Sequence, residues 1–244
     1  RAVGSGREVH RHHLDPVRLS ETMLLEIANV LSSTQCAQLR ERIGQAQFVD
    51  GRESAGAQAA RGKLNRELPA ALATELSPAI LSPLNAHPQF QAAVMPARLS
   101  SATIAQYIEG MHYDAHTDDP VMGTSGGRYR SDVAITIMLS EGGDFEGGAL
   151  SIQTAFGPQR VQLAEGAAVV YPASSIHAVE RVKRGTRLVA VAWAQSMVRA
   201  PEKRQVLFDL WRVRESLRAS VPEAKVSTET DRVYTNLVRM WAEL

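Results

Sequence analysis

The feature that most constrains the fold is a series of short apolar, β-branched runs between Leu99 and Ala194. Turns rich in glycine separate the runs, and no segment with helical periodicity lies between them. Seven or eight strands of this length, without intervening helices, are typical of an antiparallel sandwich or jelly roll. The predicted strands are Leu99–Tyr107, Val133–Leu139, Ala149–Ile152, Val161–Leu163, Ala167–Tyr171, Ala178–Val182 and Arg187–Ala194.

Helical patterns precede this β region. Ser32 and Gln35 form an S-x-x-Q capping box, and apolar residues come after it at helical spacing, which predicts a helix over 33–46. Leucines spaced by four from Leu64 to Leu76 predict a second helix, and Pro78 and Pro83 are expected to break the helical path after Leu76. The first ninety residues are therefore predicted to be mostly helical.

A helical pair is expected at the carboxyl end. Pro201 suits a first helical position, and apolar residues recur at helical spacing on both sides of a break at Pro222. We expect these helices to pack on the barrel and to join two subunits in a homodimer, because one barrel face does not bury both apolar stripes. The first stripe is Val206, Leu210, Val213 and Leu217, and the second is Val233, Leu237 and Met240.

These patterns give a mainly β fold with flanking helices, of the α+β class. Residues 1–22 carry a histidine cluster but neither apolar periodicity nor the apolar run of a secretory signal, so we expect an extension outside the fold. Residues 23–97 are expected to form a helical support region, 98–197 the jelly-roll core, and 198–244 a helical region.

Composition excludes several classes of function. Across 244 residues, 27 Lys and Arg balance 26 Asp and Glu, so no basic stripe suited to nucleic acid is present. The longest apolar runs, such as Leu188 to Ala194, are much shorter than the roughly 18 residues that span a bilayer. The single cysteine, Cys36, rules out an internal disulfide and fits a reducing compartment, so a cytoplasmic location is expected.

Two overlapping H-x-D pairs point to metal binding. His112 with Asp114, or His116 with Asp118, would present an imidazole and a carboxylate on the same face of an extended chain. A three-residue pattern of this kind arises often by chance, so alone it leaves both pairs open.

A downstream segment strengthens this interpretation. His177 would complete a two-His, one-carboxylate face, which leaves open positions on Fe(II) for a co-substrate and dioxygen. Arg187 lies ten residues later, and we expect it to begin a strand beside that of His177, across a hairpin turn at 183–186. A guanidinium suits the distal carboxylate of 2-oxoglutarate, whose keto acid end chelates iron.

At this point the chain resembles the Fe(II)/2-oxoglutarate-dependent oxygenases, and more closely the bacterial PKHD-type hydroxylases associated with iron uptake. The resemblance runs from Met23 to Leu244 and rests on a set of ordered segments. These are Val49-Asp50-Gly51-Arg52, Ala55-Gly56-Ala57-Gln58, Tyr107 with His116-Thr117-Asp118, Phe145-Glu146-Gly147-Gly148-Ala149-Leu150, Tyr171-Pro172 through His177 to Gly185 and Arg187, and Trp193-Ala194-Gln195-Ser196-Met197.

The resemblance implies a double-stranded β-helix, a jelly-roll barrel, with His116, Asp118 and His177 as Fe(II) ligands and Arg187 holding 2-oxoglutarate. The family's H-x-D comes nine residues after a tyrosine, as His116 comes nine after Tyr107, which selects this pair over His112 and Asp114. The resemblance further implies that dioxygen is consumed and that L-ascorbate rescues oxidised iron.

Some assignments stay open from sequence. Tyr107 either hydrogen-bonds the 2-oxoglutarate carboxylate or fills the barrel mouth. His112 is assigned to the rim of the site or to the residues that surround the metal ligands, and not to the ligands themselves. Asp119 would point to the face opposite Asp118, and the Gly-rich stretch 122–130 is either a substrate lid or a plain loop. Trp193 and Trp211 are assigned to the core and to a helix seam, without chemistry.

The substrate is not specified by these residues. A peptide side chain and a siderophore-like small molecule both remain compatible. Two rival functions are a cupin-type metalloenzyme that does not use 2-oxoglutarate, for which Arg187 would be a surface strand residue, and a non-catalytic iron-responsive binding module.

Overall fold

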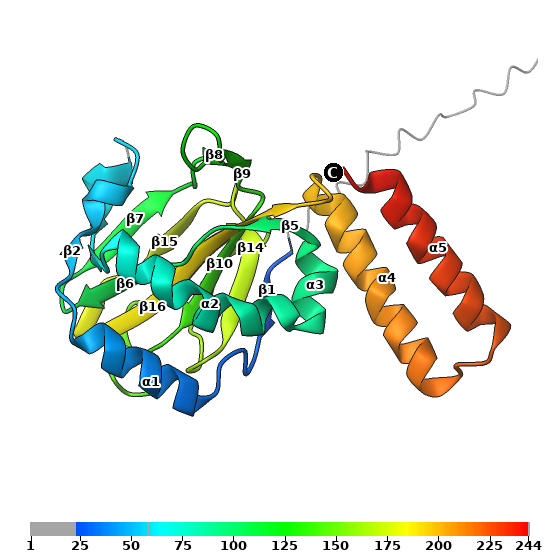
Figure 1. The fold of residues 1–244 in the computed structure, drawn as a ribbon, viewed down its shortest axis with the longest axis horizontal. Coiled ribbons are helices and arrows are strands. Elements are labelled where there is room, and N and C mark those ends of the chain that lie inside the picture. Colours follow the sequence, from blue (N-terminus) through cyan, green and yellow to red (C-terminus); the bar gives the residue numbers. More distant parts are fainter. Residues whose placement is uncertain (1–22, 58, 244) are drawn as a thin grey trace, which may run out of the picture.

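Two antiparallel sheets face each other across the centre of the protein (Figure 1). A computed structural model describes residues 23–57 and 59–243, so the expected extension at 1–22 lies outside the described residues. The major sheet has the order β1-β14-β10-β16-β6-β4-β2, with β5 and β11 also pairing with β16, and the minor sheet has the order β13-β12-β15-β7-β3. This arrangement confirms the predicted jelly-roll class.

The strands of the central β region match most of the predicted runs. Three runs differ. The strand at Val161–Leu163 ends at Val161, Leu99–Tyr107 is interrupted at 100–102, and Ala178–Val182 is divided between two strands that end at Val179 and begin at Val182. The bounds are β5 Pro96–Leu99, β6 Thr103–Ile108, β7 His112–His116, β10 Val133–Met138, β11 Phe145–Gly147, β12 Leu150–Thr154, β13 Gly157–Val161, β14 Ala168–Pro172, β15 His177–Val179 and β16 Val182–Ser196.

Strand β16 shows how the sequence alternation builds two cores. Side chains two residues apart on a strand share a face, so successive residues of β16 enter different apolar clusters. Leu188, Ala190, Ala192 and Ala194 belong to the core beneath the helices. The alternate positions Arg187, Val189, Val191 and Trp193 line a cavity between the two sheets.

Three helices cover the outer face of the major sheet (Figure 1): α1 (Ser33–Gly44), α2 (Ala70–Ala86) and α3 (Pro88–Val94). The predicted capping box at the start of α1 is confirmed. The Ser32 hydroxyl accepts a hydrogen bond from the Gln35 amide at 3.2 Å, and the Gln35 side chain accepts one from the Ser32 amide at 2.9 Å. Helix α1 ends at Gly44, two residues before the predicted end.

The prediction that Pro78 and Pro83 break the second helix is wrong, because α2 runs through both. A proline removes one helical hydrogen bond and frees the carbonyl four residues earlier. Here the freed carbonyls belong to Thr74 and Ala79, which are exposed, so water can satisfy them. Burial of the opposite face of α2 against the sheet outweighs the lost hydrogen bonds; this face consists of Ala73, Leu76, Ser77, Ile80, Leu81 and Leu84.

The prediction that the first ninety residues are mostly helical is also wrong in part. Four short strands and two 3-10 turns lie there, and the strands extend the sheets of the barrel at their edges. Strands of two or three residues carry too little alternation to be recognised from sequence. The elements are β1 Leu25–Ile27, β2 Val49–Asp50, η1 Gly51–Ser54, η2 Ala59–Gly62, β3 Lys63–Leu64 and β4 Arg66–Glu67.

The structure also corrects the expected hairpin at 183–186, because β16 runs unbroken through these residues. Strand β15 pairs with β12 and β7 in the minor sheet, so His177 and Arg187 face each other from opposite sheets. Gly185 has a φ of +80°, and a Cβ there would lie 1.9 Å from the Asp144 carbonyl oxygen. This glycine therefore permits close pairing of β16 with β11 and does not mark a turn.

The helical pair at the carboxyl end is confirmed as α4 (Pro201–Ser220) and α5 (Lys225–Trp241). The pair projects to one side of the barrel (Figure 1). Helix α4 packs on α3, with Phe208 reaching the outer core, and α5 packs on α4. The helical pair therefore packs less extensively on the barrel than the sequence analysis predicts. Among the described residues, no helix has the length and apolarity to cross a membrane.

Candidate metal and co-substrate site

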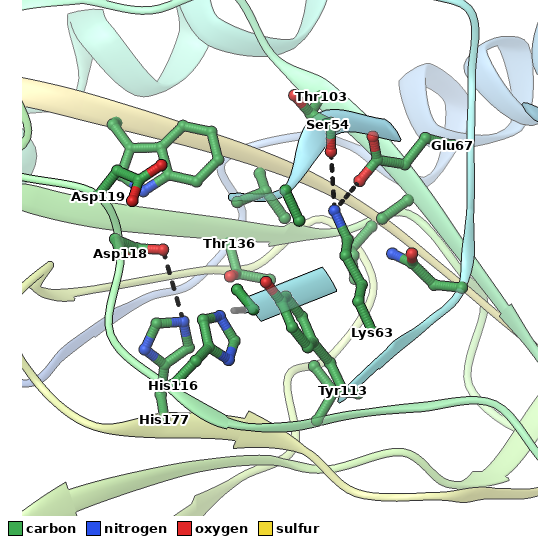
Figure 2. Close-up of a pocket in the computed structure, with 18 of the residues that line it drawn as sticks. Ser54, Lys63, Glu67, Thr103, Tyr113, His116, Asp118, Asp119, Thr136 and His177 are labelled. Atoms are coloured by element: carbon green, nitrogen blue, oxygen red, sulfur yellow. Dashed lines mark hydrogen bonds and ion pairs between the residues drawn. The ribbon is translucent and has the colours of Figure 1, made fainter. Parts of the chain in front are cut away.

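His116, Asp118 and His177 converge at one end of the cavity between the sheets (Figure 2). Their potential ligand atoms all lie within 4.8 Å of one another. His116 ends β7 and His177 opens β15, and the register of these neighbouring strands places the two residues directly opposite each other. Asp118 lies just after β7, and its carboxylate oxygen Oδ1 is 3.8 Å from His177 Nε2.

Hydrogen bonds orient both imidazoles toward the common centre. His116 Nδ1 lies 2.7 Å from the Asp114 carbonyl oxygen, and His177 Nδ1 lies 3.0 Å from that of Ser175. When Nδ1 donates to a carbonyl, Nε2 keeps its lone pair for a metal. Burial lowers the pKa of both histidines, which favours the neutral form that binds metal.

The third group supplies the charge that an Fe(II) ion needs. Burial raises the pKa of Asp118, and a bound cation would act in the opposite direction by favouring the carboxylate. The Asp118 oxygen Oδ2 is buried without a hydrogen-bond partner in the described part of the chain. Two neutral imidazoles and one carboxylate with a free oxygen fit the facial arrangement of non-haem Fe(II) oxygenases.

Arg187 lies in the same cavity with only 2% of its surface exposed. Its guanidinium is 5.2 Å from the centre of the Tyr107 ring, and Nε and Nη1 have no hydrogen-bond partner among the described residues. Burial lowers the pKa of this guanidinium. A buried cation without a partner is strongly unfavourable, so this one requires an anionic ligand. The cupin alternative, which needed Arg187 at the surface, is wrong.

The opposite wall of the cavity holds residues that the sequence analysis did not select (Figure 2). The Lys63 ammonium donates to Ser54 Oγ at 2.8 Å and to Glu67 Oε1 at 2.5 Å, and Lys63 and Glu67 are both buried. Tyr113 lies between this pair and the metal centre, with its ring 3.7 Å from that of His116. The cavity enclosed by these walls has a volume of about 420 Å³.

Trp193 was assigned to the core without chemistry, but it lines the cavity. Its indole N–H faces the Asp118 carboxylate and lowers the pKa of that group, against the larger effect of burial. The two groups do not reach standard hydrogen-bond geometry, so the indole nitrogen is unpaired in the described part of the protein. The sequence did contain a signal for this position: Trp193 lies six residues after Arg187 on the same strand, so both side chains are expected on the same face. Trp211 stacks on Phe208 within the same helix, α4, and is partly buried against the outer core.

The remaining predicted residues lie around this centre. His112 is on β7 but outside the three-residue cluster, with Nε2 3.5 Å from an Asp114 oxygen. Asp119 lines the cavity mouth, where its carboxylate faces Gly56. The stretch 122–130 is largely a hairpin of β8 (Val121–Met122) and β9 (Tyr129–Arg130), and its first residues, Met122 and Gly123, line the cavity.

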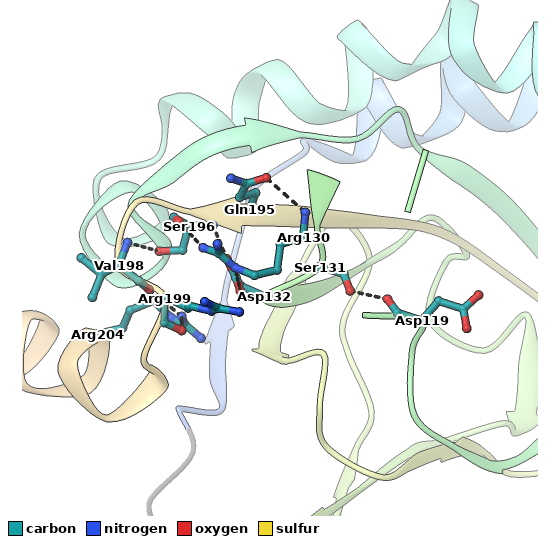
Figure 3. A network of polar contacts seen from close by, with 9 residues as sticks. All are labelled: Asp119, Arg130, Ser131, Asp132, Gln195, Ser196, Val198, Arg199 and Arg204. Atoms are coloured by element: carbon teal, nitrogen blue, oxygen red, sulfur yellow. Dashed lines mark hydrogen bonds and ion pairs between the residues drawn. The ribbon is translucent and has the colours of Figure 1, made fainter. Parts of the chain in front are cut away.

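Polar contacts connect the loop after Asp118 with the start of α4 (Figure 3). The Ser131 hydroxyl donates to the Asp119 carbonyl, and the Asp132 carboxylate accepts from Arg130 Nε at 2.6 Å and from the Ser196 amide at 2.9 Å. At the far end, Arg204 donates to the Val198 carbonyl at 2.7 Å. The junction between β16 and α4 is thus held by residues 130–132, and this segment also contacts the loop after Asp118.

Comparisons with known proteins agree with this geometry. Residues 102–195 match the family profile of the 2OG-Fe(II) oxygenase superfamily. A PKHD-type hydroxylase of Thioalkalivibrio sulfidiphilus is 49% identical over 224 residues, which cover 91% of this chain and 100% of the relative. One from Gluconobacter oxydans is 40% identical over 231 residues, with the same coverage of both chains. The chain belongs to the PKHD-type hydroxylases of the 2OG-Fe(II) oxygenase superfamily.

Solved structures share the fold at low sequence identity. A prolyl hydroxylase from Trichoplax adhaerens, in complex with a hypoxia inducible factor peptide fragment, is 16% identical with a TM-score of 0.51, over 75% of this chain and 86% of that chain. HygX from Streptomyces hygroscopicus, with nickel, 2-oxoglutarate and hygromycin B bound, is 14% identical with a TM-score of 0.51, over 72% and 84%. These likenesses support the double-stranded β-helix and nothing finer.

As a member of this family, the protein is an Fe(II)- and 2-oxoglutarate-dependent hydroxylase. The alternative of a non-catalytic binding module is therefore set aside.

Proposed function

We propose that His116, Asp118 and His177 bind the Fe(II) of this PKHD-type hydroxylase and that Arg187 binds the distal carboxylate of 2-oxoglutarate. The observation that carries the proposal is the buried, unpaired Arg187 guanidinium in the same cavity as the three-residue cluster. Tyr107 is proposed to hydrogen-bond the same co-substrate, because it lines the cavity beneath that guanidinium.

The chain's own residues set the conditions for the reaction. When bound, Fe(II) and 2-oxoglutarate with dioxygen supply the oxidant for a C–H bond, and succinate and carbon dioxide are released. His116 and His177 present their Nε2 atoms, and Asp118 adds the negative charge. Apolar side chains around this centre keep water out; they are Leu150, Val179, Val189 and Val191.

We propose that the substrate is a peptide side chain or a siderophore-like small molecule in iron homeostasis. The support is the resemblance to hydroxylases associated with iron uptake, and a cavity of about 420 Å³, which has room for more than a five-carbon diacid. L-Ascorbate is proposed as the reductant that restores Fe(II), on the same resemblance. A cytoplasmic location is proposed because Cys36, the single cysteine, fits a reducing compartment.

We propose that two copies associate through α4 and α5. Val206 and Val213 on α4 are spaced by seven residues, and so are Val226, Val233 and Met240 on α5. All five are between 40% and 72% exposed. Exposed apolar stripes with a seven-residue repeat favour packing against other helices, and a second helical pair would complete a four-helix bundle.

Paired titrations of Fe(II) and 2-oxoglutarate on wild type, Arg187→Met and Arg187→Lys test the co-substrate site. Truncating one partner of a buried charge pair costs roughly 2–5 kcal/mol, so Arg187→Met should weaken 2-oxoglutarate binding by about one to three orders of magnitude. Arg187→Lys should be intermediate, because an ammonium restores the charge without the fork. Iron affinity should hardly change.

Equal 2-oxoglutarate binding in all three proteins would remove Arg187 from the site.

A separate experiment distinguishes the two substrate classes. Succinate release by the wild-type protein is measured with capped peptides and with ferric siderophore analogues, and the class that stimulates release is the substrate class.

A further inference from the structure

The segment from Lys63 to Glu67 has an inverted pattern of polar and apolar residues. Lys63, Asn65 and Glu67 are buried, whereas Leu64 is 44% exposed. All three polar side chains line the cavity. Burying polar groups while exposing a leucine opposes folding, and such local conflicts are expected where a segment serves function.

Asn65 is the member of this trio whose side chain makes no hydrogen bond within the described residues. Lys63 and Glu67 satisfy each other, but neither Nδ2 nor Oδ1 of Asn65 has a partner in the described ranges, and the residue is 3% exposed. A buried amide left unpaired costs about 1–3 kcal/mol. Three other cavity residues, Asp118, Arg187 and Trp193, also have unpaired buried polar atoms. Asn65 therefore resembles the groups that face the proposed ligands, because each has a buried polar atom without a hydrogen-bond partner in the described residues.

The backbone is shaped to hold the Asn65 amide in one orientation. The Gly51 amide donates to the Asn65 carbonyl at 3.1 Å, and a Cβ on Gly51 would lie 1.8 Å from Asn65 Oδ1. No side chain larger than hydrogen fits at Gly51 while the amide stays in place. Because Oδ1 lies against Gly51, the other branch of the amide, Nδ2, points away from this backbone.

Asn65 lies beside Tyr107. Strand β4 pairs with β6 so that Arg66 faces Gln106, which places the preceding Asn65 opposite Tyr107, and both side chains line the cavity. Burial raises the pKa of Tyr107 to about 12, and the Asn65 amide acts in the opposite direction, as a donor to the phenol oxygen does. The two groups stop short of standard hydrogen-bond geometry. Tyr107 is paired across the strands with Arg187, whose guanidinium lies over its ring. The phenol therefore keeps its proton and lies beside the cation proposed for 2-oxoglutarate.

We propose that Asn65 is a positioning residue for 2-oxoglutarate: its amide N–H binds the Tyr107 oxygen, so that the Tyr107 proton is directed to the co-substrate carboxylate. A phenol has one proton, and a donor on its oxygen fixes the direction in which that proton points. This role rests on the proposed function of Arg187 and Tyr107. It adds a residue from outside 102–195, the range that matches the superfamily profile.

A double-mutant cycle on 2-oxoglutarate affinity tests the role. Calorimetric titration of the Mn(II)-loaded protein would use wild type, Asn65→Ala, Tyr107→Phe and the double variant. We expect Asn65→Ala to weaken 2-oxoglutarate binding about tenfold, which is about 1.4 kcal/mol. In the Tyr107→Phe background the same change should cost nothing further, because the hydroxyl that it positions is gone. Mn(II) affinity and melting temperature provide the control for folding.

Gly51→Ala offers a matched second test that leaves every proposed ligand-binding side chain intact. The added methyl displaces the Asn65 amide, so 2-oxoglutarate affinity should fall as in Asn65→Ala. Combined with Asn65→Ala, the same methyl meets only the carbonyl oxygen of residue 65, at 3.2 Å, and should add little further loss.

Two results would overturn the role of Asn65: losses that add in the Asn65 and Tyr107 double variant, or unchanged affinity in Asn65→Ala. If wild type binds 2-oxoglutarate and Arg187→Met does not, either result refutes this inference alone. If Arg187→Met binds as wild type does, the proposed co-substrate site itself is wrong.

Discussion

His116 and His177 meet because β7 and β15 are neighbours in the minor sheet and their register sets the two residues side by side. Two backbone carbonyls fix the rings, and Asp118 enters from the loop after β7. The proposed metal centre is therefore built from two strand ends and one loop residue. The family resemblance selected His116 and Asp118 in preference to His112 and Asp114, and proximity makes the same selection.

Single substitutions separate these ligands from their neighbours. His116→Ala, Asp118→Ala and His177→Ala should each weaken Fe(II) binding by roughly two orders of magnitude or more, since losing a direct ligand exceeds the 10–100-fold typical of outer-shell partners. Anaerobic titration with Fe(II) measures this affinity. His112→Ala and Asp119→Asn are the controls, and both should bind iron as wild type does. Full affinity in Asp118→Ala together with a loss in Asp119→Asn would reassign the carboxylate.

At the scale of elements, the buried pair of Lys63 and Glu67 bridges β3 and β4. Removing one partner of a buried pair leaves an uncompensated charge and typically costs about 3–5 kcal/mol, whereas replacing both by apolar residues is often neutral. We expect Lys63→Met to lower the free energy of unfolding by an amount in this range, and Lys63→Met with Glu67→Leu to recover most of it. Urea denaturation monitored by circular dichroism gives both values.

Equal losses in the single and double Lys63 variants would instead assign the pair a directly stabilising role. In that case the inverted pattern of this segment would have a structural cause.

The same segment shows why part of the site escaped prediction. Residues four apart share a face on a helix and also on a strand, so the leucines from Leu64 to Leu76 fit both periods. The helical interpretation hid the alternation of Lys63, Asn65 and Glu67, which was the available signal for the cavity wall. Long strands such as β10 and β16 were predictable because their alternation extends over enough residues.

The expected hairpin at 183–186 failed for a different reason. Gly185 does have the positive φ that is typical of a turn glycine, but here it permits the close pairing of β16 with β11. Sequence alone does not reveal which strand will approach a glycine. Likewise, the pairing of His177 with His116 in one sheet, opposite Arg187 in the other, is a property of topology that local patterns do not contain.

On the scale of the whole molecule, the helical pair at the carboxyl end is the part that leaves apolar stripes exposed. Helices α4 and α5 contact each other and α3, and only Arg204, Leu207, Phe208 and Ser227 are buried on them. The polar contacts shown in Figure 3 fix the start of α4 relative to the end of β16. The exposed apolar stripes of the pair nevertheless remain uncovered in a single copy.

The dimer is tested by placing charge on both stripes. Val213 and Val233 are 50% and 48% exposed, so glutamates at these positions disturb neither the fold of the barrel nor the proposed metal site. We expect wild type to show the mass of two chains in light scattering, and Val213→Glu with Val233→Glu to show the mass of one, because a bundle interior excludes unpaired carboxylates. Thr228→Glu together with Thr235→Glu, at exposed polar positions on the face of α5 opposite the stripe, provides a charge-matched control and should remain a dimer. A wild-type protein that stays monomeric at several hundred micromolar would show that the stripes serve another purpose than self-association.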